Sequence, residues 1–211
     1  MPRLVDHAER REQITDAARR VIGRAGLDAA TFQAVAAEAG VSVRLVQYYF
    51  GNKDGLLAAT HRAVVDASAA RFGAGGAAPG TLPPPRDALR GVVAALLPLD
   101  AQRRADAVVL AAFHAAALTR DAAAREALLT APRALVEVVA AQLDRARGAG
   151  TPGCGERDVE TSRDAELFLA TLAGLTQSVV AGHLEAEQAL AVAERLLDHL
   201  FASQAGGPAP T

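Results

Sequence analysis

The stretch from residue 31 to residue 57 constrains the fold of this chain more than any other. Thr31 is a good N-cap, because its hydroxyl can accept hydrogen bonds from the free N–H groups of a first helical turn. Gly40 ends the predicted helix in the left-handed conformation that glycine adopts at little cost. Ser42 then caps a second helix. The apolar residues of the first helix recur at i, i+3, i+4 and i+7, which is typical of one helix face: Phe32, Val35, Ala36 and Ala39.

The second predicted helix directs Val43, Val46 and Phe50 inward, so its other side chains face outward. Two helices joined by a short glycine-containing turn form a helix-turn-helix, whose second helix can lie in the major groove of DNA. No acid occurs between Glu38 and Asp54. A surface without acids suits contact with phosphates. The outward side chains are Arg44, Leu45, Gln47, Tyr48 and Tyr49.

The only lysine of the chain, Lys53, stands at the start of the next predicted helix. Its ammonium group and the free N–H groups of that helix start can bind one phosphate together. Both tyrosines, Tyr48 and Tyr49, belong to the same stretch, and their hydroxyls can donate to phosphate oxygens. The alternative is a surface lysine beside two half-buried aromatic residues. Within a helix-turn-helix, the combination favours DNA binding.

Residues from about 10 to 65 resemble the DNA-binding domain of TetR-family transcriptional regulators. The matching points are AARRVIGRAG at 17–26, Thr31, AGVS at 39–42, YYF at 48–50 and KDGLL at 53–57. Gln47 stands where the family usually has a tyrosine that touches the DNA backbone, so Gln47 can contact the backbone or a base edge. The resemblance implies base contacts for Val43, Arg44 and Leu45. It implies backbone contacts for Thr31, Gln33, Ser42, Tyr48, Tyr49 and Lys53.

Composition and charge fit a helical protein that can bind DNA through its front part. Half of the 211 residues are hydrophobic, and alanine dominates, which favours helix throughout. Residues 1–62 hold nine Lys/Arg and seven Asp/Glu, a net +2, and the remainder holds thirteen and seventeen, a net −4. The N-terminus lacks an apolar signal core, and no apolar run approaches the roughly 18 residues of a membrane span. We therefore expect a soluble, cytoplasmic protein without a membrane partner.

The expected fold is all-α, with about nine helices. An N-terminal three-helix helix-turn-helix domain is joined by a long fourth helix to a C-terminal helical bundle. A polar arm at residues 3–12 leads into the first helix, and Pro132 divides or kinks a later one. Glycine and proline mark the boundaries. Together with the resemblance, these boundaries imply a DNA-binding domain at 9–70, a Gly/Pro linker at 71–85, a ligand-binding and dimerisation domain at 86–203, and a disordered tail at 204–211.

Sequence patterns for other chemistries are weak. Gly148, Gly150 and Gly153 match G-x-G-x-x-G, but the match follows a helix and contains Pro152, so it does not predict a dinucleotide site. Cys154 is the single cysteine, which excludes an intramolecular disulfide and a cysteine-only zinc site. We expect no catalytic residue, no metal and no cofactor. Two alternatives stay open, an all-helical enzyme with its site near His114 and a protein-binding adaptor without specific DNA binding.

The C-terminal part contains candidate residues for a dimer interface and for a ligand pocket. Small residues on one late helix and an apolar stripe on the last could pair with their copies, or they could serve the chain's own core. The interface candidates are Ala170, Ala173, Gly174, Leu190, Leu197, Leu200 and Phe201. The resemblance implies a homodimeric repressor that binds double-stranded DNA at a palindromic operator and is released by a small, largely apolar effector. The pocket candidates are Phe113, His114, Phe168 and Gln177.

Overall fold

The computed structural model describes residues 3–73, 82–118, 122–148 and 159–202, and within these ranges every regular element is a helix. The prediction of an all-α chain is therefore confirmed. The predicted tail at 204–211, Cys154 and most of the predicted linker lie outside the described residues. The helices are α1 (Arg3–Ala25), α2 (Phe32–Ala39), α3 (Val43–Phe50), α4 (Lys53–Gly73), α5 (Pro85–Leu96), α6 (Ala101–Ala117), α7 (Ala122–Ala146), α8 (Val159–Val180) and α9 (Ala186–Ala202).

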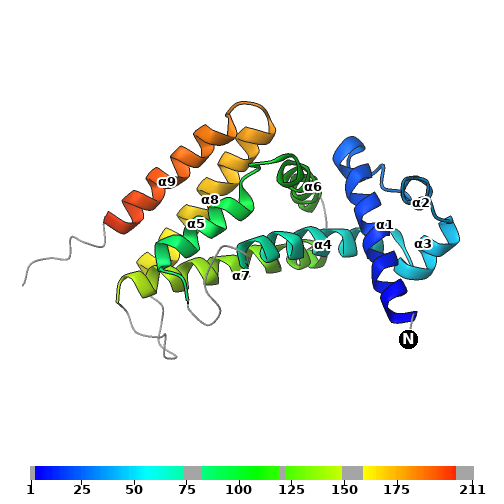
Figure 1. The fold of residues 1–211 in the computed structure, drawn as a ribbon, viewed down its shortest axis with the longest axis horizontal. Coiled ribbons are helices and arrows are strands. Elements are labelled where there is room, and N and C mark those ends of the chain that lie inside the picture. The colour runs from blue at the N-terminus through cyan, green and yellow to red at the C-terminus, as the bar shows by residue number, and fades with distance from the viewer. Residues whose placement is uncertain (1–2, 74–81, 119–121, 149–158, 203–211) are drawn as a thin grey trace, which may run out of the picture.

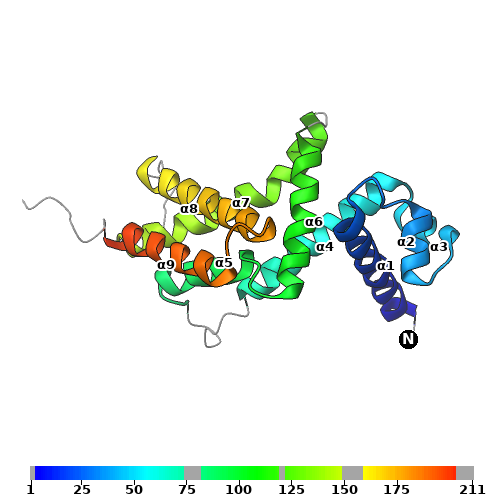
Figure 2. The same ribbon diagram turned by 90° about the horizontal axis from the view of Figure 1, so that it is seen from above.

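Helices α1, α2 and α3 gather at one end of an elongated molecule, and α4 runs from them to the bundle of α5 to α9 (Figure 1). Helix α6 stands between α1 and the rest of the bundle when the molecule is seen from above (Figure 2). Helices α8 and α9 run side by side along the bundle in both views. The helix-turn-helix is thus exposed at the end opposite to α9.

The described residues build two hydrophobic cores. The first joins α1 to α4, and it also takes Val109 and Phe113 from α6. The second joins α5, α7, α8 and α9 around Leu143, Phe168 and Leu197, which are fully buried. Helix α6 therefore binds the N-terminal helices to the C-terminal bundle, because its apolar residues complete a core that the other bundle helices do not reach.

The predicted caps form in the structure. The hydroxyl of Thr31 accepts from the backbone N–H of Ala34 at 3.1 Å, and that of Ser42 accepts from Leu45 at 3.2 Å. Gly40 ends α2 with a φ of 66°, in the left-handed region that favours glycine. These caps satisfy N–H groups that a helix start leaves without intrahelical partners.

One local expectation was wrong, and another was wrong in part. The polar residues 3–12 are not a separate arm, because α1 already begins at Arg3. Pro132 does not divide its helix, because α7 runs without interruption from Ala122 to Ala146, and the alternative of a kink at Pro132 stays a prediction. Proline removes one backbone hydrogen bond, but the later turns of α7 are anchored by fully buried side chains of the second core. No described helix is both long and apolar enough to cross a membrane.

Candidate nucleic-acid interface

Helix α3 divides its side chains between the core and the outside. Val46 and Phe50 are buried in the first core. Val43 was expected to point inward, but it is 39% exposed, because it is the first residue of α3 and lies beyond the edge of that core. Tyr48 is 74% exposed, and Leu45 is half-buried. The outer surface of α3 therefore presents a mixture of basic, amide, aromatic and small apolar side chains.

The ten predicted DNA-contact residues are accessible, as none is buried in the structure. The two cap hydroxyls accept from backbone N–H groups and still carry an O–H that can donate to a phosphate. Lys53 is exposed, and its Nζ donates to the backbone oxygen of Asp28 at 3.1 Å. These residues lie on three adjacent helix starts and on the outer side of α3: Thr31, Gln33, Ser42, Val43, Arg44, Leu45, Gln47, Tyr48, Tyr49 and Lys53.

Helix α1 holds the helix-turn-helix in place, a role that the sequence did not reveal. Gln13 donates from Nε2 to the backbone oxygen of Ala39, at the end of α2, at 2.8 Å. Arg11 donates from Nη1 to the backbone oxygen of Tyr49 at 2.8 Å, and its guanidinium lies 4.8 Å from the centre of the Phe50 ring. Both contacts cap the carboxyl end of a short helix, where carbonyl groups lack intrahelical partners. Helix α1 thereby fixes the positions of α2 and α3.

The start of α4 is equally constrained. The side-chain oxygen of Asn52 accepts from the backbone N–H of Gly55 at 2.8 Å. A Cβ atom at Gly55 would lie only 2.3 Å from the backbone oxygen of Phe50. The first turn of α4, which carries Lys53, therefore approaches the end of α3 more closely than any residue with a side chain allows.

Glu38, on α2, is neutralised by two arginines of α1. Hydrogen bonds from Arg24 and from Arg20 lower the pKa of Glu38 to about 2. The Arg20 contact, from Nε to Oε1, is 2.6 Å long. The Glu38 carboxylate, which precedes the acid-free stretch, is thus paired with arginines of α1. Residues 39–53 themselves contain no acid.

The four predicted pocket residues have different surroundings, and their role in ligand binding stays a prediction. Phe113 belongs to the first core, where its ring centre lies 5.0 Å from that of His61. Phe168 is fully buried in the second core. His114 and Gln177 are exposed on α6 and α8. Helical periodicity identifies an apolar face, but it does not say which of two cores that face will join.

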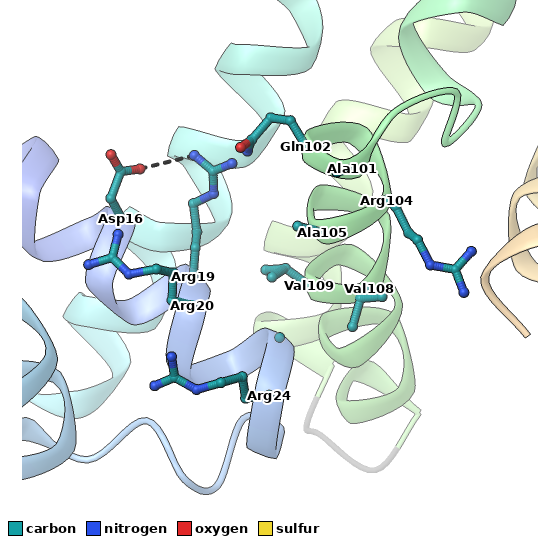
Figure 3. A pocket seen from close by; sticks show the side chains of 11 residues that line it. Asp16, Arg19, Arg20, Arg24, Ala101, Gln102, Arg104, Ala105, Val108 and Val109 are labelled. Carbon is teal, nitrogen blue, oxygen red and sulfur yellow. Dashed lines mark hydrogen bonds and ion pairs between the residues drawn. The ribbon is translucent and has the colours of Figure 1, made fainter.

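A cleft of about 640 Å³ lies elsewhere, between α1 and α6 (Figure 3). Its floor is made of small and apolar residues, and four arginines stand around it. Their guanidinium groups turn to protein partners. Arg19 pairs with Asp16 at 3.0 Å and with Asp106, and Arg104 donates to two backbone carbonyls at the end of α8. The lining residues are Asp16, Arg19, Arg20, Gly23, Arg24, Ala101, Gln102, Arg104, Ala105, Val108 and Val109.

The predicted dimer residues separate into two groups. Leu197 and Leu200 are buried in the second core, and Phe201 is half-buried, with the Arg86 guanidinium 5.8 Å from its ring centre. The core residues are not available to a partner, because the chain's own α5, α7 and α8 cover them. The accessible residues are Ala170, Ala173, Gly174 and Leu190, and two that the sequence analysis missed, Leu167 and Val192.

An exposed helix-turn-helix joined to an all-helical bundle is typical of DNA-binding transcriptional regulators. Residues 14–60 match the family model of bacterial regulatory proteins of the tetR family, and residues 85–202 match the C-terminal domain of BetI-type transcriptional repressors. The second match covers more than half of the chain. The chain therefore belongs to the TetR family of transcriptional regulators, as its helix-turn-helix predicted, and it does not belong to an enzyme family.

Relatives and solved structures agree with this assignment. The HTH-type transcriptional regulator BetI of Burkholderia thailandensis is 44% identical over 98 residues, which are 45% of this chain and 48% of that protein. BetI of Burkholderia mallei is 46% identical over 96 residues, with the same coverage. The chain thus spans about half the length of the curated relatives it matches.

Two crystal structures have the same fold. A transcriptional regulator from Rhodococcus sp. Rha1 has a TM-score of 0.76 at 29% identity, covering 92% of this chain and 96% of that one. A transcriptional regulator from Saccharomonospora viridis, solved in complex with choline, has a TM-score of 0.77 at 22% identity, covering 91% and 97%. At that identity the second structure supports the fold alone.

Proposed function

We propose that this protein is a dimeric transcriptional repressor that binds a palindromic operator in the cytoplasm and is released from it by a small effector. The acid-free outer side of α3 carries the proposal, since Arg44, Gln47 and Tyr48 are exposed beside two capped helix starts and Lys53. Helix starts and cations favour phosphates, and the exposed side chains of α3 can reach base edges in the major groove.

Arg44 is the residue that we assign to base reading, most directly to the O6 and N7 atoms of guanine. The test begins with an operator selected from random DNA and measures the affinity of Arg44→Ala for that operator and for unrelated DNA. We expect a loss of about 1–3 kcal/mol on the operator and relaxed preference at one position of each half-site. Arg195→Ala is the matched control, because Arg195 is an exposed arginine on α9. An equal loss of affinity for the operator and for unrelated DNA would mean that Arg44 contacts a phosphate and does not read a base.

The dimer is proposed to form through the exposed small and apolar residues of α8 and α9. Leu167, Ala170, Ala173 and Gly174 follow each other at i, i+3, i+6 and i+7 on α8, and small residues let a second helix approach closely. Ala173→Glu should produce monomers and weaken operator binding. The control is Val138→Glu, which places the same charge on an exposed apolar position of α7. Sedimentation that finds a monomeric wild type at micromolar concentration, with operator binding intact, would contradict the dimer.

The effector is proposed to be small and largely apolar, in line with the alanine-rich, aromatic-poor C-terminal domain. Choline is the informative comparison, because quaternary ammonium groups bind over aromatic faces. Among the described side chains of the bundle, Phe113 and Phe168 are buried in different cores, and Phe201 lies beside Arg86. These rings do not form an aromatic cage.

A thermal-shift screen of neutral apolar metabolites, with choline included, tests the effector class. Each compound that stabilises the protein is then tested for release of the operator. Release requires tighter binding to the DNA-incompetent form, since equal affinity for both forms shifts nothing. We expect release by a neutral apolar compound, and release by choline at similar concentration would contradict this effector class.

A further inference from the structure

His7, in the second turn of α1, lies against the recognition helix α3. Its Nδ1 is 2.8 Å from the hydroxyl oxygen of Tyr49, and the two rings meet edge to face with their centres 5.6 Å apart. The Tyr49 ring in turn meets the Tyr48 ring edge to face, with centres 5.3 Å apart. His7 and Tyr48 are exposed, and Tyr49 is half-buried between them. The three rings form a row along the end of α3.

The direction of the His7–Tyr49 hydrogen bond decides what the tyrosine can do. A phenol has one O–H and can also accept, whereas a neutral imidazole has one nitrogen that donates and one that accepts. If the Tyr49 hydroxyl donates to Nδ1 of His7, it has no hydrogen left for a phosphate. If Nδ1–H of His7 donates instead, the Tyr49 O–H is free. The distance of 2.8 Å fits both directions.

We propose that His7 is a positioning residue for DNA recognition, in which its Nδ1–H donates to the Tyr49 hydroxyl and directs the Tyr49 O–H to a backbone phosphate. A DNA phosphate oxygen only accepts hydrogen bonds, so it favours this direction. A hydroxyl that accepts one hydrogen bond also donates more strongly through the next. The inference rests on the proposed function, because it needs DNA at α3.

A second residue on the same face of α1 also holds Tyr49. Arg11 follows His7 by one helical turn, and it donates to the backbone oxygen of the same tyrosine at 2.8 Å. The main chain and the hydroxyl of Tyr49 are therefore both held by α1.

The test is a double-mutant cycle on operator and random DNA with the full-length protein. His7→Leu and Tyr49→Phe should each weaken binding about threefold to tenfold, the effect of one hydrogen bond, and equally on both DNAs, because a phosphate is contacted. The double variant should be no weaker than either single variant, since both remove the same contact. His7→Asn should restore affinity, because its Nδ2 amide takes the place of Nδ1 and always carries hydrogens.

The control is His183→Leu, at an exposed histidine in the turn between α8 and α9, which should leave affinity unchanged. Thermal midpoints should agree across the set, so that affinity reports on DNA contact. Additive losses, a silent variant at either position, or failure of His7→Asn to restore binding would each overturn the inference while operator binding by the wild type persists. A wild type that prefers no DNA sequence would instead overturn the proposed function, and this inference with it.

Discussion

Removal of the Asp106 carboxylate should be the most damaging polar substitution in the described part of the chain. Asp106, on α6, is only 2% exposed. It accepts hydrogen bonds from Arg19 of α1, from Arg71 of α4 at 3.0 Å, and from Gln102 of its own helix at 3.2 Å. One buried carboxylate thus connects the helix-turn-helix domain, the long α4 and the bundle.

The expected loss of stability follows from the two arginine charges that Asp106→Ala leaves without a partner. Loss of one partner of a buried ion pair costs about 3–5 kcal/mol, because the other charge stays buried without compensation. The side chains of Arg19 and Arg71 are 17% and 24% exposed, so water can partly reach them. We therefore expect Asp106→Ala to lower the free energy of unfolding by about 3 kcal/mol, at the low end of that range. Asp106→Asn keeps the volume and one acceptor, and it should lose about half as much.

Urea unfolding followed by circular dichroism measures this loss at one fixed protein concentration, since association would add to the apparent stability. Asp16→Ala is the matched control, because Asp16 pairs with the same arginine at 3.0 Å and its side chain is 43% exposed. Its loss should stay below about 1 kcal/mol. Equal losses for the two alanine variants at unchanged m-value would refute the reasoning, as the burial of Asp106 would then have no energetic consequence.

Three further outcomes follow from the structure. Gly55→Ala should lower the free energy of unfolding by about 1–3 kcal/mol, because the new Cβ meets the backbone oxygen of Phe50. Gly23→Ala should raise it by about 0.5–1 kcal/mol, because nothing lies within 4 Å of a Cβ there. Urea unfolding that ranks the two variants in the opposite order would contradict this. Lys53→Ala should weaken binding to all DNA and reduce the salt slope by about one per subunit, and an unchanged slope would remove its phosphate contact. Burial, and then nearby positive charge, lower the pKa of His61, so the unfolded chain takes up a proton at higher pH than the folded chain does. Stability should therefore fall as pH drops below about 6.5. His61→Gln should flatten this pH dependence of the thermal midpoint, and the same dependence in wild type and variant would contradict the reasoning.

The helix-turn-helix could be predicted from the sequence because its signals are local. A cap residue and the N–H group it receives are three residues apart, as with Thr31 and Ala34. Gly40 was predicted to be left-handed because it follows an apolar helical stripe, and the structure has it there. The exposed side of α3 then followed from the residues that point inward. Such features depend on neighbours in the chain, which the sequence displays directly.

The pocket and the dimer surface could not be predicted in the same way, because they depend on which helices meet. Phe113 lies on α6, yet it completes a core built mainly by α1 to α4. Leu197 and Leu190 occupy the same last helix, but only Leu197 is covered by the bundle. Asp106 and Arg19 are 87 residues apart. Neither periodicity nor composition carries information about contacts over such separations.

Selection of bound DNA from a random pool, followed by footprinting of the enriched sequence, tests the central claim most directly. The account predicts a palindrome whose half-sites are centred about one helical turn apart, ~34 Å, or slightly more, with protection lost for Arg44→Ala at the same protein concentration. A pool without an enriched sequence, or a single unpaired half-site that Arg44→Ala protects as well as the wild type does, would contradict it.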